Sequence, residues 1–177
     1  MHRIAILVLA FTLLSCRGDA QMTQALPSSN QDFARTHTSL SPQQKHRLLD
    51  GRCDLITSAS AMPNALKGAF MTTTGEQGFE LAEPGSKYQT TDVVERGSPT
   101  LPYRRLVFAG HCDDRWFIYY EHGGIAHGYS LLVYQADANQ VLQFIWGGAG
   151  FVLAKNLDDL RSAIQTGKFA DNLPFHW

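Results

Sequence analysis

The sequence has only three cysteines among 177 residues, no excess of either charge, and no apolar run long enough to cross a bilayer. With 15 basic and 16 acidic side chains, the formal net charge is −1. This balance argues against a protein that binds nucleic acid through its phosphates. Apolar residues make up 44% of the chain, which is too much for an intrinsically disordered protein. Length and composition therefore predict one globular domain.

The start of the chain carries the pattern of a secretion signal. His2 and Arg3 precede an eleven-residue apolar run, 4–14, whereas a bilayer-spanning helix needs about 20 such residues. The run ends in Leu13-Leu14-Ser15-Cys16, which resembles the lipobox of bacterial lipoproteins. In that family the signal peptide is cleaved before the cysteine, which is then acylated. The resemblance covers positions 1–16 and implies a signal peptide over 1–15 and a lipidated Cys16.

The same resemblance implies a location. Arg17 stands where aspartate would hold an enteric lipoprotein at the inner membrane, so we expect anchoring at the periplasmic face of the outer membrane. Acyl groups such as palmitate would supply the two hydrophobic attachments that stable anchoring needs. The alternatives are a conventional signal peptide cleaved after Ala20, which would release a soluble periplasmic or secreted protein, and an uncleaved membrane anchor.

The two other cysteines form an even pair once Cys16 is lipidated. Export to an oxidising compartment predicts a disulfide between Cys53 and Cys112, the alternative being two buried free thiols. Cys112 follows His111, an arrangement that could activate a thiolate nucleophile. A disulfide would remove that chemistry.

Behind the lipidated cysteine we expect a tether and then helices. Positions 16–40 are rich in polar residues and have no apolar period, which is typical of a flexible tether. One globular domain is expected over 41–177. Ser41-Pro42 supplies an N-cap and a first-turn proline for a helix over 42–50, and 64–70 has the pattern of a second short helix. A C-terminal helix is expected to begin at Asn156 and end before Gly167.

The sequence from residue 78 to 146 favours strands, because β-branched and aromatic runs alternate with turn residues. Short connections between the last four runs predict an antiparallel β-meander. The fold class is therefore α+β: a single domain with about five to six strands, packed with short N-terminal helices and a C-terminal helix. The expected strands are 79–81, 88–94, 103–109, 115–121, 129–135 and 141–146.

The run 115–121 is apolar on both sides. Alternation places Trp116, Ile118 and Tyr120 on one face and Phe117 and Tyr119 on the other. Such a sheet must be covered on both faces or present an aromatic face to a partner.

Two polar turns are candidates for a site. The turn 111–114 and the loop 121–128 flank one strand, so we expect them at its opposite ends, about 20 Å apart. Within the loop, Glu121, His122 and His127 could ligate zinc, although their spacing lacks the paired pattern of specific zinc motifs. The interpretation we favour is a glycine-rich loop that holds no metal and needs no cofactor.

Hydrolysis is a second hypothesis. It would use Ser130 or Ser60 as nucleophile, a histidine as base, and Asp113 or Asp114 to orient that base. The nucleophile-elbow pattern is missing around Ser130, because no second glycine follows it. No motif assigns a catalytic residue, so we expect a binding role rather than an enzyme.

The loop 121–128 and its flanking aromatics are the features from which we predict a function. Aromatic side chains are enriched at protein interfaces, and a protruding loop can insert into the cleft of a partner. Of the six nearby tyrosines and tryptophans, some are expected at the surface. The predicted partner-binding residues are Tyr120, Glu121, His122, Gly123, Gly124, His127 and Tyr129.

The sequence thus predicts a lipid-anchored periplasmic binding protein with a protein partner. We expect an immunity or inhibitor protein that binds an envelope-directed toxin or lytic enzyme, by analogy at the level of size and build. A small periplasmic hydrolase using a histidine-containing loop, or a structural lipoprotein of the envelope, are the alternatives. Contact with the membrane is expected through the lipid anchor, and nucleic acid is not an expected partner.

Overall fold

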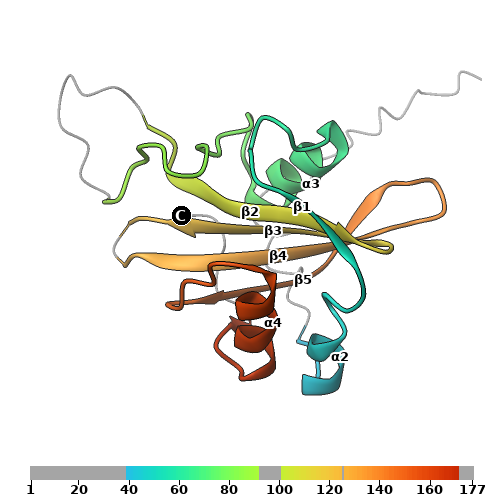
Figure 1. Cartoon of the computed structure of the whole chain (residues 1–177). Coiled ribbons are helices and arrows are strands. Elements are labelled where there is room, and N and C mark those ends of the chain that lie inside the picture. Colours follow the sequence, from blue (N-terminus) through green and yellow to red (C-terminus); the bar gives the residue numbers. More distant parts are fainter. Residues whose placement is uncertain (1–38, 92–100, 125, 172–177) are drawn as a thin grey trace, which may run out of the picture.

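The core of the molecule is an antiparallel sheet of six strands that follow one another in sequence order, with helices on both faces (Figure 1). The computed structural model describes residues 39–91, 101–124 and 126–171. The elements are α2 (Pro42–His46), β1 (Cys53–Ile56), α3 (Asn64–Thr74), β2 (Arg104–Cys112), β3 (Arg115–His122), β4 (Gly128–Ala136), β5 (Leu142–Gly150), α4 (Leu157–Gln165) and β6 (Ala170–Asp171).

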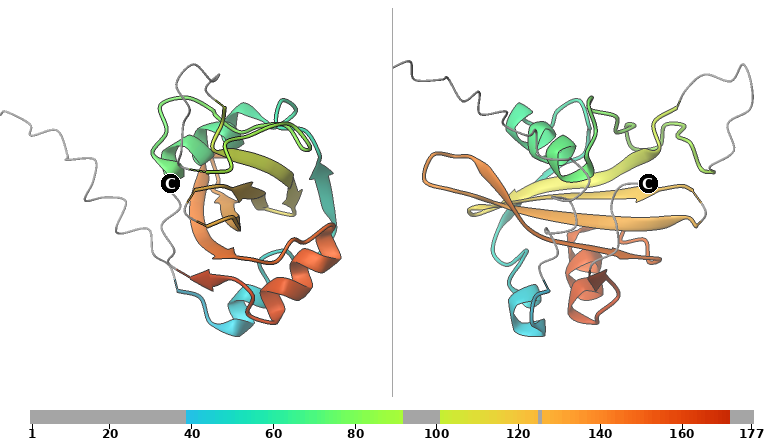
Figure 2. Two further views of the ribbon diagram at one scale, coloured as in Figure 1. Left: turned by 90° about the vertical axis from the view of Figure 1, so that its left-hand side faces the viewer. Right: turned by 180° about the vertical axis from the view of Figure 1, so that it is seen from behind.

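Strands β2 to β5 form the predicted meander, which confirms the α+β fold class. A two-residue turn joins β2 to β3, and its Asp113 adopts a left-handed backbone with φ of 54°. Register shifts in β2 between Leu106 and Phe108, and in β4 between Val133 and Tyr134, mark bulges. Bulges increase local twist, and the sheet curls strongly when seen from its side (Figure 2).

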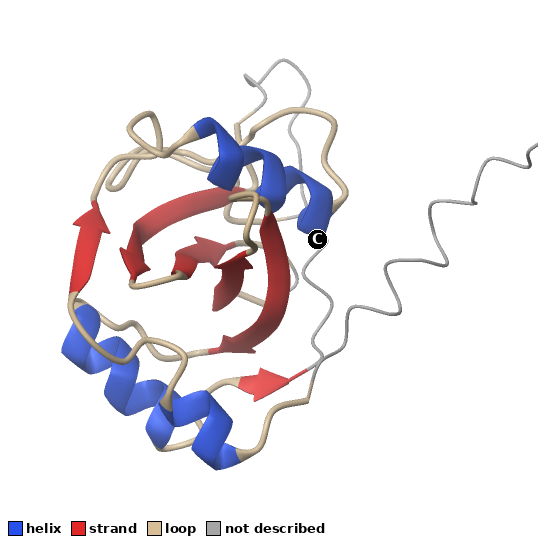
Figure 3. Ribbon diagram, turned by 90° about the vertical axis from the view of Figure 1, so that its right-hand side faces the viewer, coloured by secondary structure: helices blue, strands red, loops and turns tan. Residues whose placement is uncertain are grey.

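Both faces of the sheet are covered, as the alternation along β3 requires. Phe117 and Tyr119 face a core cluster that includes residues of α4 and the two leucines after α2, Leu48 and Leu49. Ile118 and Tyr120 face the second core cluster, which α3 covers. Figure 3 shows α3 and α4 on opposite sides of the strands.

The helices begin where the sequence predicts. Ser41 caps α2 in a reciprocal capping box with Gln44, and the helix ends at His46, before a turn that continues to Leu49. Asn156 caps α4 by accepting a hydrogen bond from the Asp159 N–H at 2.9 Å. The chain leaves that helix at Gly167, with φ of 69°.

Helix α3 is longer than predicted, because it runs through three consecutive threonines to Thr74. Each threonine hydroxyl donates to the carbonyl four residues earlier, at 2.9 to 3.0 Å. These bonds satisfy the polar side chains within the helix. Gly75 then ends the helix in a left-handed conformation with φ of 74°.

Two predicted strands are wrong in the described part of the chain. Residues 79–81 form no strand, and neither do 88–91, while 92–94 lie outside the described residues. The segment runs alongside β2 with a single bridge at Ala82, whose N–H and C=O bond to the backbone of Arg104 and Leu106 at 2.9 Å. The Pro84-Gly85 turn interrupts it directly afterwards.

Two observed strands, β1 and β6, were not predicted. β1 is short and mostly exposed, so it lacks an apolar signal, and it is joined covalently to β2. The predicted disulfide is present: Cys53 pairs directly opposite Cys112 with a Cα–Cα distance of 4.2 Å.

The N-terminal predictions fall mostly outside the described residues. The signal peptide 1–15, the lipidated Cys16 and the tether up to residue 38 are in this group. The last two tether positions belong to the fold, since Leu40 packs on the core and the Ser39 hydroxyl donates to Asp171 at 3.3 Å.

Candidate functional site

The two polar turns lie at opposite ends of β3, as predicted. We call the end with the 113–114 turn and Cys112 the disulfide end. The end at which β3 runs into β4, with residues 121–128, is the loop end. In Figure 1 the disulfide end is on the right and the loop end on the left.

The side chains of the disulfide end are engaged in local structure. His111 lies against Trp116, with ring centroids 4.4 Å apart. The Asp114 carboxylate accepts a hydrogen bond from Gln135 at 2.7 Å and lies 3.8 Å from Arg115. Because Cys112 is in the disulfide, it cannot act as a thiolate nucleophile.

At the loop end, Glu121 is the centre of a polar network. Its side chain is buried, with 8% of the residue exposed. Arg105 Nε donates to Oε1, while the Tyr88 hydroxyl donates to Oε2 at 3.1 Å. His127 Nε2 lies 3.0 Å from the same Oε2. Both carboxylate oxygens are therefore occupied, by partners from β2, from the segment around Tyr88 and from the loop itself.

This network shifts the pKa values of Glu121 and Tyr88 and so sets their protonation states. Burial by itself raises the pKa of Glu121, but hydrogen bonds from Arg105, His127 and Tyr88 outweigh it and lower that pKa overall. Glu121 therefore remains ionised at neutral pH. Burial and the adjacent Glu121 charge raise the pKa of Tyr88 to about 12, so its hydroxyl stays protonated and can donate. Arg105 also packs on the Tyr88 ring, 4.6 Å from its centroid.

The histidines of the loop do not converge with Glu121 as a zinc triplet. His127 is on the Glu121 side and is about half exposed, whereas alternation along β3 turns His122 toward the opposite face. His122 Nδ1 lies 3.3 Å from the Gly123 carbonyl, and burial lowers the pKa of His122. The described part of the chain holds no group of three His, Cys, Asp or Glu side chains that could bind a metal.

The first half of the β3–β4 loop is held against a neighbouring segment. Gly123 N–H donates to the Tyr103 carbonyl at 3.4 Å, and Gly124 N–H donates to the Thr90 carbonyl at 3.3 Å. A Cβ atom at position 123 would lie 2.4 Å from the Gln89 carbonyl oxygen, so only glycine fits there. His127 fixes the second half through Glu121.

Several predicted partner-binding residues prove to be buried. Tyr120 is fully buried beneath α3, because its place on β3 faces the core, and it is not a surface residue. Tyr129 and Glu121 are 8% exposed and Gly123 is buried, which leaves half-buried His122 and Gly124 and exposed His127 as the accessible residues of the set. Helices cover both faces of the sheet, so the six nearby tyrosines and tryptophans are not surface residues as expected. Trp116 is half-buried, and the other five are buried: Tyr119, Tyr120, Tyr129, Tyr134 and Trp146.

The exposed apolar surface lies on residues that the sequence analysis missed. Phe151, Val152 and Leu153 follow β5 and are 77%, 43% and 45% exposed. The Tyr119 hydroxyl holds their backbone by donating to the Val152 carbonyl at 2.8 Å and accepting from Ala154 N–H at 3.0 Å. We call residues 151–153 the apolar ridge. Three consecutive apolar residues between a glycine run and a helix cap were the available sequence signal.

The ridge and the loop are neighbours. Gly150, which directly precedes the ridge, pairs with Tyr129, two residues after His127. The Tyr129 ring contacts the rings of both His127 and Tyr119, at centroid distances of 5.1 and 5.9 Å. Both features therefore lie at the loop end, connected through the largely buried Tyr129 and Tyr119 rings.

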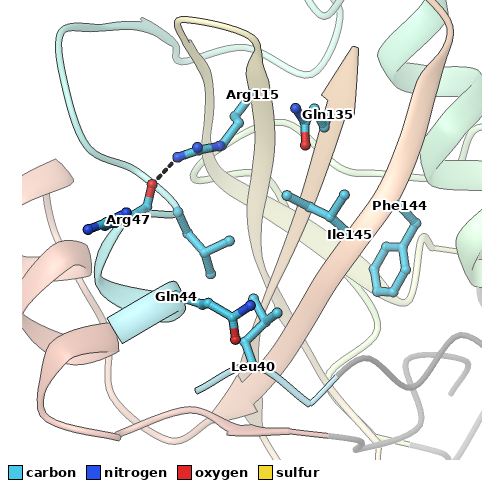
Figure 4. A pocket seen from close by; sticks show the side chains of 8 residues that line it. Leu40, Gln44, Arg47, Arg115, Gln135, Phe144 and Ile145 are labelled. Atoms are coloured by element: carbon cyan, nitrogen blue, oxygen red, sulfur yellow. Dashed lines mark hydrogen bonds between the residues drawn. The ribbon is translucent and has the colours of Figure 1, made fainter. Parts of the chain in front are cut away.

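Two hollows open on the described surface. One, of about 600 Å³, adjoins the network and is lined by Lys87, Tyr88, Thr90, Leu101, Arg105, Glu121 and His127. The other, of about 440 Å³, lies between α2 and strands β3 to β5, and Figure 4 shows Arg115 bonded to the Arg47 carbonyl at its edge. We call the first the Glu121 pocket.

The residues of the hydrolase hypothesis are not brought together. Ser130 is buried in β4, facing α3. Ser60 instead helps to bind Glu83, whose carboxylate accepts from the backbone N–H groups of Ala59 and Ser60 at 2.7 and 2.8 Å. Asp113 and Asp114 lie at the opposite end of β3 from both loop histidines.

Comparison with protein-family models, with curated proteins and with solved structures finds no match to this chain. Among the described residues, no helix has the length and apolar character that a membrane span requires.

Proposed function

We propose that this chain is a lipid-anchored binding protein of the bacterial envelope. In this proposal it is an immunity or inhibitor protein that binds an envelope-directed toxin or lytic enzyme, and the loop end is the binding surface. The membrane anchor and the periplasmic, outer-membrane location rest on the lipobox resemblance at positions 1–16.

The observation that carries the proposal is that described residues of the β3–β4 loop are held in place. Glycine-containing loops lose conformational entropy when they bind, and this loss weakens binding. Here Tyr103 and Thr90 hold Gly123 and Gly124, and Glu121 holds His127. Residues held before they meet a partner suit insertion into a preformed cleft, as an inhibitor requires.

The apolar ridge supplies a second part of the surface. Phe151 is 77% exposed on a backbone that Tyr119 holds on both sides. Aromatic residues are enriched at protein interfaces, and burial of a phenylalanine contributes about 2 kcal/mol. Exposed Tyr103, whose carbonyl accepts from Gly123, lies on the other side of the loop. An apolar contact beside a polar loop is the usual composition of a binding surface.

Capture and inhibition together test the proposal. The lipid-anchored chain is purified from detergent-solubilised envelopes, co-purifying proteins are identified, and the activity of the captured protein is measured with added chain. We expect stoichiometric inhibition by the wild type and capture weakened about tenfold by Phe151→Ala. Loss of the His127 side chain should weaken capture less.

The matched control is Val141→Ala. Val141 is 52% exposed and lies between β4 and β5, at the disulfide end. Its replacement should leave both capture and inhibition unchanged. The proposal is contradicted if Val141→Ala and Phe151→Ala weaken capture equally. It is also contradicted if the captured protein keeps full activity in the presence of excess chain.

A further inference from the structure

We propose that the Glu121 pocket binds a carboxylate group, which an acidic side chain of the partner protein supplies. The inference deepens the proposed function and rests on it for the source of the carboxylate. Binding of the carboxylate itself depends only on the residues that line the pocket.

Two cationic side chains in the pocket keep donor groups after the network is formed. Arg105 uses Nε for Glu121 and Nη1 for the Ser86 carbonyl, and no described residue accepts from Nη2. His127 uses Nε2–H for Glu121, so Nδ1 of the neutral ring is an acceptor and adds no donor to the pocket. The ammonium of exposed Lys87 also pairs with no described residue. The donors that remain at this site therefore belong to Arg105 and Lys87.

Glu121 does not accept hydrogen bonds from these remaining donors. It lies at the buried side of the pocket, and its two oxygens already accept from Arg105, Tyr88 and His127. The described lining residues thus carry the positive charges of Lys87 and Arg105 against one fixed negative charge. The positive side chains are the more exposed ones, so the opening of the pocket favours an anion.

The arrangement suits a carboxylate better than a phosphate. The positive charges of Lys87 and Arg105 exceed the single negative charge of Glu121 by one, which matches a carboxylate with one charge rather than a phosphate group with nearly two. The unused N–H groups of Arg105 and the Lys87 ammonium can donate to its two oxygens. Leu101 lines the same pocket and offers an apolar contact for the carbon atoms that carry the group.

The apolar ridge strengthens the case for a protein as the source. A partner that covers both Phe151 and the pocket at the loop end would exclude water from the pocket, and exclusion of water strengthens an ion pair. A free small carboxylate would bind without this help, and hence weakly.

The first experiment measures carboxylate binding to the full chain in detergent micelles. Acetate, phosphate and chloride are titrated at equal ionic strength while NMR follows Arg105 Nε–H and the His127 ring. We expect saturation by acetate in the millimolar range, and about threefold weaker binding in Lys87→Ala. The matched control Lys155→Ala should bind as the wild type does, and the Arg161 Nε–H, which donates to the Leu49 carbonyl, should not shift.

The outcomes separate the ligand classes. Saturable acetate binding that depends on Lys87 supports the pocket. Shifts that do not saturate, or that chloride reproduces, overturn it. Binding of phosphate that is tighter than binding of acetate overturns the carboxylate assignment.

The second experiment uses partner capture and keeps the two proposals distinguishable. Charge reversal by Lys87→Glu should weaken capture at least about tenfold, whereas Lys155→Glu should not. Capture that survives Lys87→Glu but is lost in Phe151→Ala supports the proposed function and overturns this inference. If acetate binds while the wild type captures no protein, the proposed function fails, the pocket is retained, and the partner as carboxylate source is rejected.

Discussion

The two ends of β3 are built on different physical principles. At the disulfide end, a covalent bond joins β1 to β2 and a two-residue turn leads from β2 into β3. At the loop end, an ionic network around Glu121 and a few backbone hydrogen bonds hold a longer connection, with a pocket and exposed apolar residues beside it. The difference shows that a covalent bond stabilises one end of the strand and polar contacts hold the other, the end at which we propose binding.

Of the changes considered, removal of the disulfide is expected to lower the free energy of unfolding most. The double change Cys53→Ala and Cys112→Ala should lower the free energy of unfolding by about 2–5 kcal/mol, because the unfolded chain loses the constraint of the closed loop. Denaturant titration measures the loss. Binding of acetate at the loop end should be unchanged under conditions where the variant remains folded. A change in acetate affinity would show that the two ends are coupled.

The substitution Glu121→Gln weakens the ionic network at the loop end. The neutral amide leaves Arg105 and His127 with a weaker acceptor, and we expect a loss of about 2 kcal/mol at neutral pH. Because the folded-state pKa of Glu121 is lowered, its contribution is complete above the unfolded value, near 4.5, and is lost as the pH falls through the folded value. The stability difference between variant and wild type should therefore shrink in acid. A difference that stays constant from pH 7 to pH 3 would contradict this account.

Tyr119→Phe should have the smallest effect on stability of the three, about 1 kcal/mol, because two hydrogen bonds to the ridge backbone are lost. Amide exchange at Ala154 should also become faster. The matched control is Tyr134→Phe, since the buried Tyr134 hydroxyl has no hydrogen-bond partner in the described part of the chain. That change should be neutral or stabilising. Equal losses in the two variants would contradict the role of Tyr119.

Much of the fold could be predicted from local patterns, whereas much of the site could not. The alternation along β3 predicts a sheet covered on both faces, and the caps at Ser41 and Asn156 predict two helix starts. Burial of Tyr120 and exposure of Phe151 were not predictable in this way, because both residues are aromatic. Which of the two is exposed depends on where α3 and α4 pack.

The glycine run 147–150 shows the same limit at a single strand. It ends the predicted strand at 146, but β5 continues to Gly150. A Cβ atom at position 148 would lie 2.6 Å from the Trp146 ring and 2.9 Å from Phe169, so glycine makes room for two aromatic side chains. The second of these is 21 residues further along the chain, and no local pattern contains that contact.

The α+β class, the β2–β5 meander and the cysteine pair could all be predicted, because periodicity, turn residues and cysteine count are local or compositional properties. The arrangement of the loop end depends instead on contacts between distant parts of the chain. Glu121 and His127 are six residues apart in one loop, but Arg105 reaches Glu121 through the pairing of β2 with β3, and Tyr88 comes from a segment outside the sheet. The position of the ridge at the same end follows from the pairing of β4 with β5, which the spacing of residues along the chain does not encode.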